Sequence, residues 1–108
     1  MLGCQTGYNI TGGENTCIGK HSGANIGGHA GNTCVGYQSG RHAYGYNTCV
    51  GEHAGYTCYG NHNTYLGYYS GYNATGGSNN VAIGNRSGYH TTGSHNVSIG
   101  DYAGHQTY

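Results

Sequence analysis

The chain has 108 residues, with 24 glycines and 13 tyrosines but no proline, phenylalanine or tryptophan. Isoleucine, leucine and valine together number eleven, too few for a thick apolar core. Three basic and three acidic residues give a formal charge of zero, which argues against nucleic acid or an anionic membrane surface as partner. We expect no membrane span, because no apolar run approaches the roughly 20 residues that one needs. Such a chain is either disordered or adopts a fold in which a few aliphatic residues suffice for the core.

A repeat of 15–17 residues runs through the whole sequence. Each copy has an aliphatic residue followed by glycine, and a second glycine four residues later with serine, alanine or threonine before it. The unit reads N-T/V-x-I/V-G-x-x-S/A-G, and seven copies form one repeat array over 1–108, without a linker and uncapped at both ends. The paired glycines are Gly3, Gly7, Gly19, Gly23, Gly36, Gly40, Gly51, Gly55, Gly67, Gly71, Gly84, Gly88, Gly100 and Gly104.

A period near 16 residues is too short for helical-hairpin repeats and is typical of one coil of a β-solenoid. We therefore predict an all-β fold, a parallel β-roll of about seven coils without helices. The paired glycines would turn the chain sharply or take a positive φ. A second strand would follow the second glycine of each copy, as at 8–11. In chain order, the first strands are expected at 15–18, 32–35, 47–50, 63–66, 80–83 and 96–99.

Alternation along the first strand predicts which side chains enter the coil. Ile18 shares a face with Thr16, and this face is apolar or β-branched in every copy, so we expect it to point inward. Asparagine and Cys17 lie on the opposite face, which would point outward. In the second strand, Ile26 and Ala43 are expected inward. The predicted core ladder consists of Leu2, Ile18, Val35, Val50, Leu66, Ile83 and Ile99.

Two copies near the end of the chain resemble a known family. N-V-A-I-G at 80–84 with N-R-S-G at 85–88, and N-V-S-I-G at 96–100 with D-Y-A-G at 101–104, resemble the head repeats of trimeric autotransporter adhesins. Similar repeats occur in phage and algal-virus tail fibres, and the resemblance covers essentially the whole chain. It implies a left-handed β-roll, three chains packed side by side, and a place on an extracellular or virion-borne fibre.

Cys17, Cys34 and Cys49 share one register on successive coils, so their Cα atoms are expected about 4.8 Å apart. A disulfide between coils or chains, a soft-metal ladder, and simple stacking of small side chains all stay open. Stacking is favoured, because Ala82 and Ser98 occupy the same position in later copies. The cysteine spacing lacks the C-x-x-C pattern of zinc sites, so we predict no metal and no other cofactor.

Tyr56, Tyr72 and Tyr89 form a second ladder at the start of the second strand. Stacked rings would stabilise the solenoid, whereas exposed rings could form a recognition surface for a glycan, and stacking is favoured. The G-x-x-S-G string looks like a phosphate loop or a nucleophile elbow. It recurs in every copy without the lysine or the acid–base partners that those sites need, so it predicts a corner.

These observations predict a structural or adhesive fibre segment rather than an enzyme, located outside the cell or on a virion surface. Its partners would be copies of itself, in a trimer or in a filament stacked end to end, and possible targets include a cell-surface glycan or protein. One alternative is an ice-binding solenoid, in which Thr16, Thr33 and Thr48 would order water. The predicted inward position of these threonines argues against it. A glycan-binding repeat is the other alternative.

Overall fold

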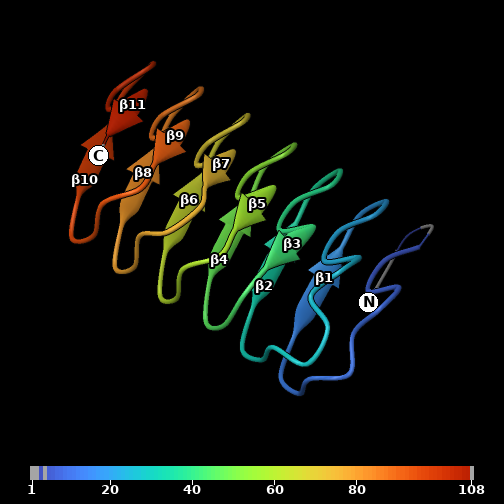
Figure 1. The fold of residues 1–108 in the computed structure, drawn as a ribbon. Coiled ribbons are helices and arrows are strands. Elements are labelled where there is room, and N and C mark those ends of the chain that lie inside the picture. The colour runs from blue at the N-terminus through green and yellow to red at the C-terminus, as the bar shows by residue number, and fades with distance from the viewer. Residues whose placement is uncertain (1–2, 4, 108) are drawn as a thin grey trace.

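The computed structural model describes residues 3 and 5–107. Across these residues the chain forms short strands and turns but no helix. The described part of the chain therefore contains no helix long and apolar enough to cross a membrane. The strands, shown in Figure 1, are β1 (Thr16–Ile18), β2 (Thr33–Val35), β3 (His42–Ala43), β4 (Thr48–Val50), β5 (Thr57–Cys58), β6 (Thr64–Leu66), β7 (Asn73–Ala74), β8 (Val81–Ile83), β9 (His90–Thr91), β10 (Val97–Ile99) and β11 (Gln106–Thr107).

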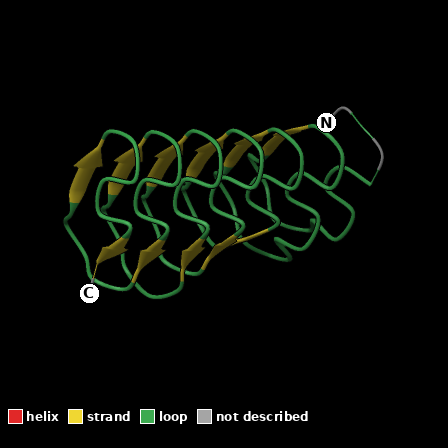
Figure 2. Ribbon diagram, turned by 90° about the horizontal axis from the view of Figure 1, so that it is seen from above, coloured by secondary structure: helices red, strands yellow, loops and turns green. Residues whose placement is uncertain are grey.

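The strands stack as a parallel β-solenoid of about five turns, which confirms the predicted all-β fold. One sheet has six strands in the order β1-β2-β4-β6-β8-β10. On the other side of the coils lie a three-stranded sheet, β3-β5-β7, and a pair, β9-β11. Figure 2 shows the two rows of strands on opposite sides of the stacked loops. Pairing is in register, with Cys17 opposite Cys34 and Cys34 opposite Cys49.

The paired glycines form the corner that follows each strand of the six-stranded sheet. The first glycine of a pair has φ between 118° and 131°, and the second has φ between 55° and 61°. A Cβ atom at Gly51 would lie 2.5 Å from the carbonyl oxygen of Gly67 in the next coil. Glycine is therefore required both by the backbone conformation and by the close approach of successive coils.

Three residues lie between the two glycines of a corner, and the middle one also has a positive φ although it is not glycine in any described copy. His53 and Tyr69, with φ of 58° and 55°, are two of the seven residues at this position. Hydrogen bonds between coils hold it in place, for example from the Tyr69 amide to the Glu52 carbonyl at 2.9 Å. Because this conformation is costly for a side-chain-bearing residue, the regular stacking must compensate for it at each corner.

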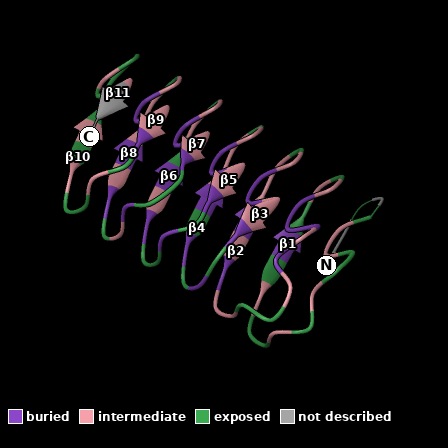
Figure 3. Ribbon diagram, viewed as in Figure 1, coloured by how far each residue is buried: buried purple, intermediate pink, exposed green. Residues whose placement is uncertain are grey.

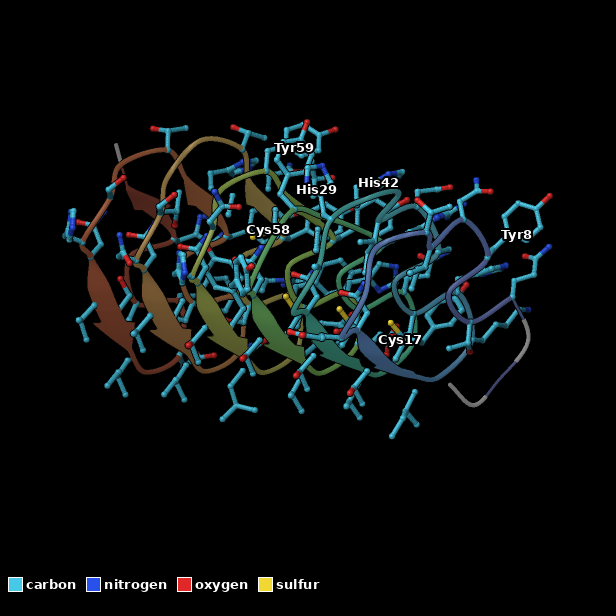
Figure 4. The ribbon with its side chains drawn as sticks, turned by 90° about the horizontal axis from the view of Figure 1, so that it is seen from below. Tyr8, Cys17, His29, His42, Cys58 and Tyr59 are labelled. Atoms are coloured by element: carbon cyan, nitrogen blue, oxygen red, sulfur yellow. The ribbon has the colours of Figure 1, made fainter. Side chains whose placement is uncertain are left out.

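The predicted inward face of the first strand is wrong. Cys17, Cys34, Cys49 and Tyr65 point into the coil and have no exposed surface. The predicted core ladder points outward, and Ile99 is 64% exposed. Figure 3 shows the resulting alternation along the strands, and Figure 4 shows the Cys17 and Cys58 sulfurs inside the coils. Of the ladder, Ile18, Leu66 and Ile99 are exposed and Val35, Val50 and Ile83 half-buried, while Leu2 lies outside the described residues.

Volume explains the inversion. The coil is so thin that a Cβ atom at Gly40 would collide with the Cys34 sulfur, and one at Gly55 with the Cys49 sulfur. Small side chains fit this interior, whereas a column of isoleucine, leucine and valine would not. In the second strands, the buried Ile26 and Ala43 confirm the predicted inward direction.

Polar side chains complete the interior. Asn47, Asn63 and Asn80 are buried, and each Oδ1 accepts from the backbone amide of the asparagine in the next coil, as from Asn63 to Asn47 at 2.9 Å. The Nδ2 of Asn63 donates to the Gly77 carbonyl at 3.0 Å. Ser39 Oγ donates to the Cys49 carbonyl at 2.6 Å. These bonds satisfy buried polar groups and link each coil to its neighbour.

Candidate functional site

The outer side of the six-stranded sheet carries two straight ladders, which we call the outer face. In-register pairing places like positions of successive coils side by side, about 4.8 Å apart. Figure 4 shows a row of side chains extending from this sheet, away from the coils. The first ladder is Thr16, Thr33, Thr48, Thr64, Val81 and Val97, and the second is Ile18, Val35, Val50, Leu66, Ile83 and Ile99.

The outer face is uncharged and mostly aliphatic. Leu66 is 42% exposed, and Val97 is 71% exposed. Strands of a parallel sheet are usually covered on both faces, but here only the inner face packs against the rest of the chain. A continuous exposed aliphatic strip of this kind is uncommon on the surface of a monomeric protein.

A more polar column lies beside the outer face, at the corner after the first glycine. Tyr37 and Tyr68 are exposed there, and Arg86 lies over the Tyr68 ring with its guanidinium carbon 5.6 Å from the ring centroid. An apolar centre beside a polar and aromatic edge matches the anatomy of protein–protein interfaces. The members of this column are Lys20, Tyr37, Glu52, Tyr68, Asn85 and Asp101.

The tyrosine ladder stacks along the solenoid. The ring centroids of Tyr56 and Tyr72 are 5.1 Å apart, as are those of Tyr72 and Tyr89, and His105 continues the stack at 5.0 Å. Tyr69 packs beside Tyr72 at 4.9 Å. Since each ring covers the face of the next, the column leaves mainly ring edges and hydroxyl groups uncovered. The flat ring faces on which a sugar would stack are covered by neighbouring rings.

Histidine rings also stack on tyrosine rings along the solenoid. His53 stacks on Tyr69 with centroids 4.6 Å apart, and burial lowers the pKa of His53 although the neighbouring Glu52 opposes the shift. In the part of the chain that the structure describes, no three His, Cys, Asp or Glu side chains form a group able to hold a metal ion. The stacking of His53 on Tyr69 was missed from the sequence, because the corner residue alternates between histidine, tyrosine, glutamine and arginine.

The three predicted cysteines line the inside of β1, β2 and β4. Cys17, Cys34 and Cys49 are fully buried with free thiols, and Cys58 lies across the coil from Cys49. The candidate sites of the sequence therefore separate in space. The cysteines lie inside, the aliphatic ladder outside, and the tyrosines along the corner before the second strands.

Comparison with protein-family models, with curated protein sequences and with solved structures gives no match for this chain.

Proposed function

We propose that this chain is a structural, adhesive segment of an extracellular or virion-borne fibre, whose copies associate through the outer face. The single observation that supports the proposal is the outward direction of the aliphatic ladder. An exposed side chain such as Ile99 becomes buried only when a second chain packs against the outer face. Full burial of one such side chain contributes about 1.5–3 kcal/mol, so several in a row favour association.

The finer features of the proposal follow from the resemblance of 80–84 and 96–100 to adhesin head repeats. We infer three chains packed side by side, each a left-handed roll of about seven coils, with end-to-end stacking as a second mode of assembly. The role is non-enzymatic, and the adhesive target is a cell-surface glycan or protein. Of the two targets, protein is favoured, because the stacked tyrosines offer ring edges rather than faces.

The test is the oligomeric state of the whole chain, measured by light scattering after size exclusion. The wild type is expected to be oligomeric, and Val50→Asp with Ile83→Asp is expected to give monomers, because two carboxylates would be buried without partners. Thr75→Asp is the matched control, since Thr75 is exposed after β7, away from the outer face. A wild-type chain that stays monomeric at high concentration would overturn the proposal, provided circular dichroism shows it folded.

Ice binding is a second candidate, and a specific observation favours it. Thr16, Thr33 and Thr48 point outward, contrary to the expectation that argued against ice binding. Threonine and aliphatic groups repeat about every 4.8 Å across the parallel strands and about every 6.6 Å along them, so the surface is regular. Such a surface holds water in ordered positions between its methyl and hydroxyl groups.

Thermal hysteresis separates the two candidates. An ice-binding chain is expected to act as a monomer and to lose hysteresis when Thr33→Lys and Thr48→Lys interrupt the ladder. The fibre segment is expected to show no hysteresis. Hysteresis from the wild type that these two substitutions abolish, in a chain that light scattering shows to be monomeric, would replace the first proposal with the second.

A further inference from the structure

The inside of β1, β2 and β4 carries three thiols in one line, which we call the thiol column: Cys17, Cys34 and Cys49. Pairing in register places Cys17 beside Cys34 and Cys34 beside Cys49. The strands that carry neighbouring cysteines are about 4.8 Å apart. All three are fully buried, as is Cys58 beside the column. β2 is paired with β1 on one side and with β4 on the other, and β4 is also paired with β6, so the backbone pairing fixes the column.

The thiols are neighbours in the column. Cys34 lies between Cys17 and Cys49, and Cys49 also has Cys58 as a neighbour across the coil. Hydrogen bonding to Cys34, together with burial, raises the pKa of Cys49, whereas hydrogen bonds from both neighbours lower the pKa of Cys34. The middle thiol, Cys34, has a sulfur on either side.

The stacked geometry opposes a disulfide within the column. A disulfide requires sulfurs about 2.05 Å apart and Cβ atoms about 3.5–4.5 Å apart, closer than in-register stacking allows. Bringing two sulfurs together would also distort the bonds between coils, such as the one from the Gly36 amide to the Ile18 carbonyl at 2.8 Å. The free thiols of the structure accord with this argument.

The same geometry suits a different bridge. Thiolate sulfur binds soft metal ions at about 2.3 Å, the distance known for zinc, so an ion between two sulfurs in line spans about 4.6 Å. That span is close to the spacing of successive coils. Zinc itself requires four ligands around a point, and no suitable group of three or more exists among the described residues.

We propose that the thiol column binds soft monovalent cations, Cu(I) or Ag(I), each held in two-coordinate geometry between the sulfurs of successive coils. One ion lies between Cys17 and Cys34 and a second between Cys34 and Cys49, so Cys34 is a ligand of both. Each cation replaces one thiol proton, which is released to solvent, and no electron is transferred. The exchange buries no net charge, which the dry interior requires. This inference is independent of the proposed fibre function.

The test is a titration of the reduced, whole chain with silver nitrate in chloride-free buffer that contains excess glutathione. A cation held by one thiol alone passes to glutathione, whereas one held by two fixed thiols is retained. Native mass spectrometry is expected to show two silver ions on the wild type. In a Cys58→Ala background, which removes the thiol beside Cys49, it is expected to show one on Cys17→Ala and none on Cys34→Ala, although both variants lack the same number of thiols.

Folding and specificity are controlled in the same experiment. Alanine suits this register, because Ala82 occupies it in β8, so the variants are expected to keep the wild-type circular dichroism spectrum. Cys58→Ala removes a buried thiol outside the column and is expected to keep both ions. Zinc(II) is expected not to be retained. Failure of the wild type to retain silver, or equal retention by Cys34→Ala and Cys17→Ala, would overturn the proposal.

Discussion

The coils lined by cysteine and the coils lined by alanine or serine have the same backbone but different side chains on both faces. In β2 and β4 the inward residue is cysteine and the outward partner is threonine, whereas in β8 they are Ala82 and Val81. The inner position accepts Cys, Ala and Ser because they are small. The outer position accepts Thr and Val because they are β-branched. The comparison teaches that volume selects the inner residues and strand geometry selects the outer ones.

Tyr65 lies at the junction of the two regions and breaks the rule of small inner residues. It is fully buried, and its ring packs against Gly71 and Gly55. Its hydroxyl lies near Asn80 and Cys58 without a well-formed hydrogen bond to either. The glycines make the room that this ring needs.

Removing the ring is expected to destabilise the chain more than truncation of any other buried side chain, because Tyr65 is the largest of them. Tyr65→Ala leaves a cavity between the two regions and should lower the free energy of unfolding by about 3–5 kcal/mol. Tyr65→Phe keeps the ring and is expected to change stability by less than about 1 kcal/mol, because the hydroxyl gains little. Urea denaturation of both variants measures the difference. Equal losses would mean that the hydroxyl, not the ring, stabilises the junction.

Two corner glycines provide a matched pair, one from each region. Gly51 and Gly100 have φ of 131° and 126°, so alanine is equally strained at both. Their surroundings differ, because a Cβ atom at Gly51 would lie 2.5 Å from the Gly67 carbonyl oxygen, whereas at Gly100 the nearest atom is 3.8 Å away. The pair separates backbone strain from crowding between coils.

Gly100→Ala is expected to cost about 1–3 kcal/mol from strain alone, and Gly51→Ala about 2 kcal/mol more, because the coils must move apart. The midpoint of urea denaturation measures both. Similar costs for the two variants would show that the backbone conformation, and not the approach of the next coil, is what glycine provides.

Much of the fold is predictable from the sequence, because a repeated glycine pair leaves few alternatives to a stack of coils. The periodicity of Ile18-Gly19 and its copies indicates both the solenoid and the corners, and each of those glycines has a positive φ. The small residues of the second strand, such as Ala43 and Ala74, are predictable in the same way. These features depend on spacing and size, which a sequence displays directly.

The direction of the first strand could not be predicted from hydrophobicity. Alternation assigns two faces but does not say which is inside, and hydrophobicity selects the more aliphatic face, which is the wrong one. In a coil this thin, the better signal is side-chain volume, since Cys17, Ala82 and Ser98 are small. Tyr65 obscures that signal. The asparagines suit corners by residue type, and their buried ladder depends on contacts between coils that no single copy reveals.

As the pH rises, the stability of the chain is expected to fall first through the buried cysteines, before the buried tyrosine contributes. Contact with Cys34 and burial raise the pKa of Cys49, so the folded chain keeps this proton when the unfolded chain loses it. Stability is then fully present below the unfolded pKa of about 8.5 and falls above it, by about 1.4 kcal/mol per pH unit for each such thiol. Burial raises the pKa of Tyr65 in the same sense, and this contribution begins near pH 10.

Urea denaturation at pH 7.5, 9.5 and 10.5 measures this dependence. Replacing Cys17, Cys34 and Cys49 together with alanine is expected to remove the loss between pH 7.5 and 9.5 and to keep the later loss from Tyr65. A wild-type chain equally stable at pH 7.5 and 9.5 would show that the thiols ionise as readily in the folded state as in the unfolded one.

The smallest effect on stability is expected for substitutions on the outer face, where the two regions carry threonine and valine at equivalent positions. Thr48→Val and Val81→Thr exchange the outer residues, and each is expected to change the free energy of unfolding by less than about 0.5 kcal/mol, because neither side chain packs inside the coil. Their effects on assembly should be opposite. Thr48→Val extends the aliphatic strip and should strengthen association measured by sedimentation, while Val81→Thr should weaken it. If Thr48→Val weakened association instead, the threonine hydroxyls would make specific contacts across the interface, and the outer face would be more than an apolar surface.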